Sequence, residues 1–201
     1  MFSHYYMGET SGYTAAVASS IILNLHYADA VRTGFNANKL IANLDAGLPV
    51  EVGLSSHAVV ADGYGYHNGT LYIHINYGHG DNKNGWYDST QQVQDKNIQD
   101  MVANIFPPTR GARHSSVISG RVLDANGDPV ANATVTATDL SSYAVVLTNS
   151  NAKGIYAFIL PAGNYAFVPS GTAATPSSPV RRRPAPRVTA GATARTTARA
   201  A

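Results

Sequence analysis

The sequence predicts an α+β domain followed by a small all-β sandwich and a disordered tail. Apolar residues recur at helical spacing within residues 10–47, whereas later segments alternate apolar and polar residues between turn pairs, as strands do. A stretch rich in Pro, Gly, Arg and Ser at 107–116 is typical of a linker. We therefore expect domains at 1–106 and 117–169, with the tail at 170–201.

Two helices are expected to open the first domain. The segment at 10–26 has small and apolar residues at helical spacing, with Thr10 or Ser11 as its N-cap. The segment at 36–47 begins with asparagines suited to capping and stops at Gly47. Both helices precede the first strand, so they are expected to lead into the sheet.

An antiparallel sheet is expected to follow the helices. The segment PVEVGLS begins it, HAVVADGY comes next, and Asn68-Gly69 is a strong signal for a two-residue hairpin turn. The returning strand, LYIHINY, alternates, and GWYD and MVANIF complete the sheet. The alternation places Tyr72, His74 and Asn76 on one face and Leu71, Ile73, Ile75 and Tyr77 on the other.

Short strands separated by turns occupy the region from Val117 to Pro169. The strand-like segments are VISGRVLD, VTATD, AVVLTN, IYAFILP and NYAFVP, a spacing typical of a small β-sandwich. The tail that follows consists mainly of Pro, Ser, Thr, Ala and Arg, and it has too little apolar surface to offset the entropy of ordering. Its RRRPAPR run is open to three interpretations: an anchor for an acidic surface, a solvated segment, or the product of a reading-frame error.

Charge and composition exclude some classes of function. The net charge of the 201 residues is +2, but the tail from residue 170 holds six Arg and no acid. Residues 1–169 carry eight Lys and Arg against twelve Asp and Glu, so this part is mildly acidic and offers no basic face for nucleic acid. No apolar run is long enough to span a membrane. The N-terminus lacks the layout of a signal peptide, so we expect that the protein stays inside the cell or that its true start lies upstream.

One histidine stands out as a candidate catalytic residue. His57 begins an apolar strand, and Asn76 follows on the strand expected to pair with it. A histidine that activates a nucleophile must be held in one tautomer and orientation, and an asparagine oxygen can do this without adding charge. The two side chains therefore make chemical sense as one unit.

The segments SHAVVADGY and IHINYGHGDNKNGWYD resemble the C-terminal lobe of streptopain-like cysteine peptidases, which are secreted endopeptidases of papain-like fold. The resemblance implies that His57 is the catalytic histidine and that Asn76 orients it. Tyr77 stands where the family has the Trp that shields this contact, and Gly78 matches a glycine of the following loop. The resemblance also implies a peptide or protein substrate, no cofactor and an extracellular location.

The sequence departs from the family in ways that bear on activity. Ser56 replaces a Gly, His79 a second Trp and Asp81 a Gly. The chain has no cysteine, and only 56 residues precede His57. We therefore expect that the lobe carrying the Cys and the oxyanion-hole donor is missing, and that this chain alone does not cleave peptides.

A metal site is the other chemistry considered for the first domain. His67, His74 and His79 are close in sequence, with Asp62 and Asp81 nearby. Zinc needs three or four ligands that converge on one point. Because His67 lies in the expected hairpin turn and His79 in the following loop, we expect them to point in different directions and predict no metal site.

The second domain resembles carboxypeptidase regulatory-like modules, small β-sandwiches of transthyretin type. The match lies in SGRVLDANGDPVANATVTA and in TNSNAKGIYAF. Such modules follow catalytic or binding domains in secreted proteins, and the resemblance implies no particular ligand.

The sequence therefore favours the His/Asn part of a cysteine peptidase joined to a sandwich. Three alternatives stay open: a catalytically dead pseudoenzyme or adhesive protein that only binds, a fragment without function, and a transferase that uses the same kind of site.

Overall fold

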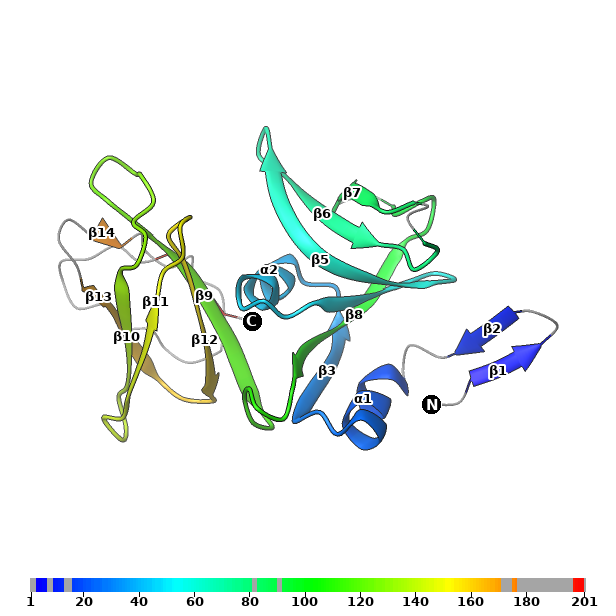
Figure 1. Ribbon diagram of the computed structural model, residues 1–201, viewed down its shortest axis with the longest axis horizontal. Helices are drawn as coiled ribbons and strands as arrows, with labels where there is room; N and C mark the ends of the chain where they lie inside the picture. Colours follow the sequence, from blue (N-terminus) through cyan, green and yellow to red (C-terminus); the bar gives the residue numbers. More distant parts are fainter. Residues whose placement is uncertain are drawn as a thin grey trace. The chain divides into compact units, whose positions relative to one another are not determined.

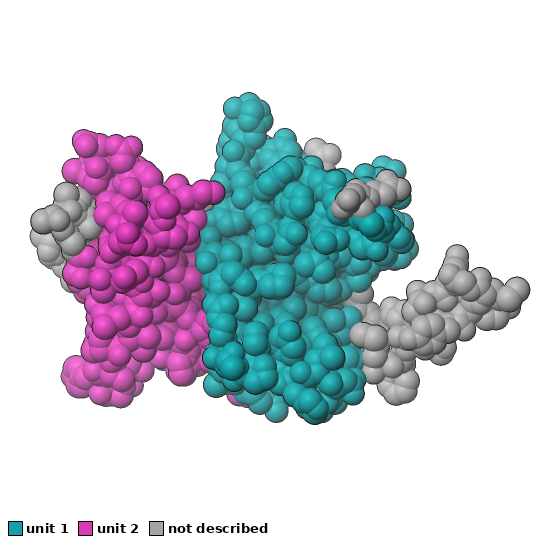
Figure 2. Space-filling model, in the orientation of Figure 1, with its two compact units in different colours: residues 1–113 teal, residues 114–201 magenta. Residues whose placement is uncertain are grey.

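The computed structural model describes residues 3–6, 9–12, 16–80, 83–89, 92–170, 175–176 and 197–200. The chain divides into two compact units, 1–113 and 114–201 (Figure 2). The boundary between them falls inside the stretch expected to be a linker.

The first unit is α+β, as predicted (Figure 1). Six of its strands form one antiparallel sheet in the order β3-β8-β4-β5-β6-β7, and β1 and β2 pair separately. Its described elements are β1 (Ser3–Tyr6), β2 (Glu9–Gly12), α1 (Val17–Leu25), β3 (Asp29–Gly34), α2 (Ala37–Asp45), β4 (Val50–Leu54), β5 (Ala58–His67), β6 (Thr70–Asn76), β7 (Gly85–Asp88) and β8 (Ile98–Phe106).

The first helix begins later than the sequence predicts. Thr10 and Ser11, the expected caps, lie in β2, where they pair with Tyr5 and His4 of β1. Backbone groups committed to a strand ladder cannot begin a helix. Residues 13–15 lie outside the described residues, and the helix starts after Ala16, which makes no side-chain cap.

The second helix forms as predicted. Asn36 Oδ1 accepts a hydrogen bond from Lys39 N at 3.0 Å, which satisfies one of the free N–H groups of the first turn. Gly47 follows with a φ of +69°, a conformation that glycine adopts without strain. Leu40 and Ile41 point into the core against the sheet, where they are almost completely buried.

The hairpin between β5 and β6 also confirms the prediction. Asn68 and Gly69 both have positive φ, 49° and 81°, as a tight two-residue hairpin turn requires. Ile73, Ile75 and Tyr77 face the core and are buried, whereas Asn76 is exposed on the other face. The period of two in the sequence therefore correctly separates the two faces of β6.

Two features of the sheet were not predicted. β3 was missed, and it pairs with β8 about seventy residues later in the chain, from Asp29↔Phe106 to Gly34↔Asp100. β8 itself lies between β3 and β4, inside the sheet, rather than closing it at an edge. Both features depend on pairing between segments that are far apart in the sequence, and the short-range periodicity of apolar residues cannot predict such pairing.

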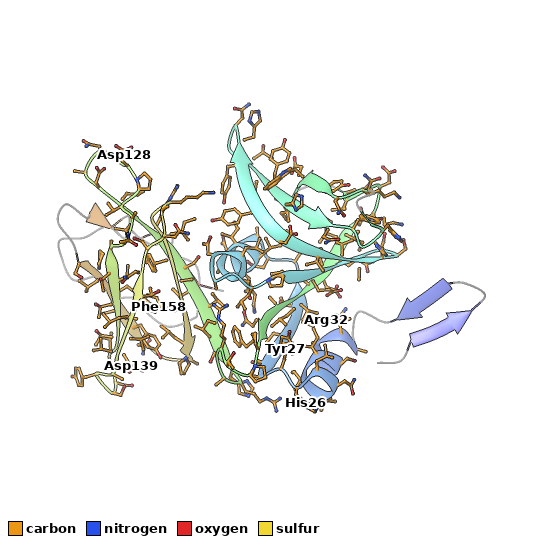
Figure 3. The ribbon with its side chains drawn as sticks, in the orientation of Figure 1. His26, Tyr27, Arg32, Asp128, Asp139 and Phe158 are labelled. Carbon is orange, nitrogen blue, oxygen red and sulfur yellow. The ribbon has the colours of Figure 1, made fainter. Side chains whose placement is uncertain are left out.

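The second unit is an all-β sandwich (Figure 1). One sheet has the order β11-β10-β13, and in the other β9 pairs with β12, β14 and β15. The core contains aromatic residues such as Tyr156, Phe158 and Phe167, and Figure 3 labels Phe158. The described strands are β9 (Ser115–Leu123), β10 (Thr134–Asp139), β11 (Val145–Asn149), β12 (Ile155–Pro161), β13 (Tyr165–Ser170), β14 (Thr175–Pro176) and β15 (Thr197–Ala200).

Turn chemistry shapes the ends of this sandwich. Asp124 Oδ1 accepts hydrogen bonds from the N–H groups of Asn126 and Asp128, both at 2.9 Å, which closes the predicted NGDP turn. Gly154 has a φ of +73°, and a Cβ there would lie 2.5 Å from Val122 O, so only glycine fits.

The segment expected to be a tail, 170–201, lies mostly outside the described residues. Its described parts are Ser170, which ends β13, and the short strands β14 and β15, both antiparallel to β9. The predicted disorder of the remainder stays a prediction. Within the part of the chain that the structure describes, no helix is long and apolar enough to cross a membrane.

Candidate active site

The candidate catalytic histidine lies at the start of β5, where the chain returns from β4. The turn between the two strands is fixed by backbone hydrogen bonds, Leu54 N to His57 O at 2.7 Å and Ser55 N to Asn97 O at 3.0 Å. Lys96 Nζ donates to Ser56 Oγ at 2.5 Å and ties the turn to the segment before β8. His57 is half-buried, and it lies at the end of a turn held by these three hydrogen bonds.

One hydrogen bond fixes the tautomer of the imidazole. His57 Nε2 lies 2.9 Å from the carbonyl oxygen of Tyr77. Because a carbonyl oxygen only accepts, Nε2 must carry the hydrogen, and in the neutral ring the lone pair then belongs to Nδ1. Nδ1 is therefore the nitrogen that can take up a proton.

Two rings hold the imidazole in place. The Tyr77 ring lies 4.6 Å from it, centroid to centroid, at a tilt of 31°, and is only 2% exposed. The His79 ring stacks on it at 5.0 Å and 14°. Lys83 Nζ lies 5.2 Å from the centroid of the Tyr77 ring, a cation–π distance. Tyr77 thus forms the buried wall of the site and His79 its exposed wall.

Asn76 takes a different position from the one its expected role implies. Its side chain is exposed at the end of β6, and its Oδ1 accepts from Gly78 N at 3.0 Å. Gly78 has a φ of +81°, and Asn84 Oδ1 accepts from Tyr77 N at 2.7 Å. Asn76 and Gly78 therefore form the turn that aims the Tyr77 carbonyl at His57, and direct orientation of the imidazole by Asn76 stays a prediction.

Two contributions to the site were missed from the sequence. The Tyr77 carbonyl is a backbone group, so its role as the acceptor for His57 Nε2 cannot be predicted from the residue type. The stacking of His79 could have been predicted from the sequence, because an imidazole ring replaces the Trp that the resemblance implies at this position.

A partly buried charged cluster lies elsewhere on the same sheet and was also missed. Glu51 on β4 has both carboxylate oxygens buried. Burial and the charge of Asp100 raise the pKa of Glu51 to about 7, although Arg32 and the Val102 backbone lower it in part. Arg32, labelled in Figure 3, donates from Nε to Asp100 Oδ2 at 2.7 Å. A Glu within an apolar strand was the signal that could have indicated this cluster.

The histidines considered for metal binding do not converge. His74 Nδ1 lies 2.6 Å from Asp62 Oδ1, and its ring meets Trp86 edge-on at 5.1 Å. His67 contacts Asn68 in the turn, and His79 stacks on His57. Asp81 lies outside the described residues. In the part of the chain with described side chains, no three potential ligands gather closely enough to hold a metal ion.

The fold and the site together define an α+β unit with one oriented imidazole at the head of a strand, joined to an all-β unit. Residues 4–87 match the model of the Peptidase C10 family, and residues 117–199 match the carboxypeptidase regulatory-like domain. The chain therefore contains a Peptidase C10 family segment, the streptopain family, followed by a carboxypeptidase regulatory-like domain.

The Peptidase C10 match includes all four candidate site residues, His57, Asn76, Tyr77 and Gly78. The second match extends beyond the end of the sandwich expected at residue 169. The comparison with curated proteins gave no match, and neither did the comparison with solved structures.

Proposed function

We propose that this chain carries the general-base part of a cysteine-type endopeptidase, with His57 as the base. The observation that carries the proposal is the hydrogen bond between His57 Nε2 and the Tyr77 carbonyl, which leaves Nδ1 as the proton acceptor. The Peptidase C10 match supports a protein substrate. The secreted location belongs to the same proposal and rests on the resemblance alone.

In this mechanism the nucleophile is a thiol from a lobe that lies outside this chain, because the chain has no cysteine. His57 Nδ1 takes the thiol proton as the sulfur attacks the peptide carbonyl carbon. The imidazolium then donates this proton to the leaving amine, and a water molecule hydrolyses the thioester. Throughout, Nε2–H stays on the Tyr77 carbonyl, whose partial negative charge stabilises the imidazolium.

Complementation tests the proposal directly. The full chain is mixed with a separately produced, cysteine-bearing lobe of a Peptidase C10 enzyme, and cleavage of a fluorogenic peptide is measured. We expect cleavage with the wild-type chain and a loss of about 100-fold or more with His57→Ala, since a general base typically contributes that much. His67 is an exposed histidine at the end of β5, and His67→Ala is the matched control that should leave the rate unchanged.

Imidazole nitrogen NMR gives a second test that needs no partner lobe. The neutral His57 ring should carry its hydrogen on Nε2. A hydrogen on Nδ1 would contradict the proposed role of the Tyr77 carbonyl.

A binding protein without catalysis is the second candidate, and the absence of any cysteine favours it. In that case the chain should bind peptides with an affinity that His57→Ala changes little. Isothermal titration with a single defined peptide, together with the complementation assay, distinguishes the two functions. The binding protein binds the peptide but gives no cleavage with the added lobe, whereas the peptidase proposal requires cleavage that depends on His57.

A further inference from the structure

Exposed apolar side chains gather on one hairpin of the second unit. The loop between β10 and β11 exposes Leu140 by 40% and Tyr143 by 77%. β11 itself exposes Val145 by 57%, Val146 by 44% and Leu147 by 63%. Concentration of this kind on a single hairpin marks an interaction surface more often than scattered exposure does.

The strand in this hairpin is the edge of its sheet. The order β11-β10-β13 leaves one side of β11 without a strand among the described residues. In an antiparallel ladder, directly opposed residues alternate between hydrogen-bonded and non-bonded pairs. Knowing one bonded pair therefore fixes which backbone groups of β11 face outward.

Two flanking hydrogen bonds fix this alternation. Asp139 N donates to Ala144 O at 2.9 Å, and Ser150 N donates to Ala133 O at 2.9 Å. Counting inward along the register from either end makes Val146 and Thr148 the residues that bond to β10. The N–H and C=O groups of the other three residues point away from the sheet; these are Val145, Leu147 and Asn149.

The opposite edge of the same sheet is protected, whereas β11 is not. By the same alternation, the outward groups of β13 belong to Tyr165, Phe167 and Pro169. Pro169 has no N–H to offer a further strand, and a proline at an edge is a known protection against pairing. The segment 145–149, VVLTN, contains neither proline nor charge.

We propose that the free edge of β11 pairs antiparallel with β11 of a second copy of this chain, about a two-fold axis at Leu147. This register places Leu147 opposite Leu147 of the second copy, and Val145 opposite Asn149. All six outward N–H and C=O groups of each strand then find partners, and two three-stranded sheets become one of six strands.

The self-pairing follows from the composition and direction of the strand. Identical strands meet at a two-fold axis without like-charge repulsion only if they carry no charge near it, and 145–149 carries none. On the outer face, Leu147 lies level with Thr136 of β10, which in turn pairs with Val168 of β13. The uncharged row on this face therefore continues across the axis. The proposal is independent of the peptidase function, because it rests on the second unit.

Cysteine cross-linking of the full chain tests the register. The chain has no cysteine, so Leu147→Cys provides a single thiol, and bonded antiparallel pairs have Cα atoms about 5.5 Å apart, within disulfide range. We expect Leu147→Cys to form a covalent dimer under mild oxidation at least tenfold faster than Val168→Cys. The control residue lies on the same face, is 54% exposed, and belongs to β13. Equal rates for the two variants would overturn the proposal.

Sedimentation equilibrium over a range of protein concentrations tests the edge itself. Leu147→Pro removes one outward N–H from each copy and leaves the donors that face β10 in place. It should raise the dimer dissociation constant about tenfold to a hundredfold. Leu147→Lys, which keeps the backbone intact and places two charges at the axis, should do the same, whereas Val168→Lys should not. A wild-type chain that stays monomeric at all concentrations, or a dimer weakened as much by Val168→Lys, would show the proposal to be wrong.

Discussion

The two units of this chain enclose polar groups of different kinds. Among the described residues, the first unit buries carboxylates and amides, including Asp29, Asp100, Asn43 and Asn104. Among the described residues of the second unit, the buried polar side chains carry hydroxyls: those of Ser115, Ser119 and Ser150, together with the hydroxyl of Tyr156. A buried serine hydroxyl needs only one or two hydrogen bonds, whereas a buried carboxylate or amide needs several hydrogen-bond partners around it. The unit that holds His57 is thus also the one that maintains buried charge.

The second unit depends instead on apolar packing. Phe158 lies between Tyr156 and Phe167, with ring centroids at 5.9 and 5.6 Å. Turns at its ends are closed by side-chain oxygens of residues such as Asp124 and Asp139, and Figure 3 labels Asp139 and Asp128 at opposite ends of this unit. Stability in this unit should therefore respond mainly to volume changes, and in the first unit to polar substitutions and pH as well.

The largest expected effect is the loss of an aromatic side chain from the second unit. Phe158→Ala should lower the free energy of unfolding of that unit by about 3–5 kcal/mol, because it leaves a cavity among rings. Far-UV circular dichroism in denaturant reports both units, whereas Trp86 is the single Trp and reports the first. A parallel loss in the Trp86 transition would show that the two units do not unfold separately.

The next largest effect is the loss of a buried polar side chain, which can be compared between the two units. Asn43 is fully buried; its amide donates to Asn104 Oδ1 at 3.1 Å and accepts from Asn104 N at 2.8 Å. Asn43→Ala should cost about 2–4 kcal/mol, since it removes both bonds to Asn104 and the bond from Asn43 Nδ2 to Lys39 O at 2.9 Å. Ser150 accepts from Ala133 N at 2.9 Å and donates to Val130 O at 2.6 Å, and Ser150→Ala should cost only about 1–2 kcal/mol.

Denaturant unfolding of both variants measures this difference. Equal losses, or a larger loss for Ser150→Ala, would contradict the view that the first unit depends more on its polar network.

The smallest expected effect is the pH dependence of the first unit. Because the pKa of Glu51 is raised to about 7 in the folded protein from an ordinary 4.5, the folded state binds more protons than the unfolded state between these values. Stability should therefore fall as pH rises from about 4.5 to about 7, by roughly 1–2 kcal/mol once partial solvent exposure is taken into account.

Glu51→Gln isolates this contribution. The variant should be more stable than the wild type at pH 8 and about equal to it at pH 5, measured by Trp86 fluorescence in urea. If the difference between the two proteins did not change with pH, the buried carboxyl would not be the titrating group.

Local features of the molecule could be predicted from the sequence because they depend on residues only a few positions apart. Asn36 caps α2 through Lys39 N, three residues on, and Asn68-Gly69 turns a hairpin through its own backbone angles. The alternation along β6 needs no partner to be recognised. His57 was found in the same way, from its place at the head of an apolar strand and from the segment's resemblance to a known family.

Features that join distant segments could be seen only in the structure. β3 has few apolar residues and is a strand because β8 pairs with it. The expected helix start at Thr10 was wrong because β1 takes up that backbone. Glu51 acquires its raised pKa from burial and from Asp100, forty-nine residues away in the sequence.

The features of the candidate site likewise separate into those that the sequence predicts and those that only the structure shows. The sequence by itself determined which imidazole to examine and which residues form the following turn. Only the tertiary structure decided that the acceptor for Nε2 is the Tyr77 carbonyl and that His79 covers the ring. The physical reason is that a backbone carbonyl is present at every residue, so its role depends on where the fold directs it and not on the residue type.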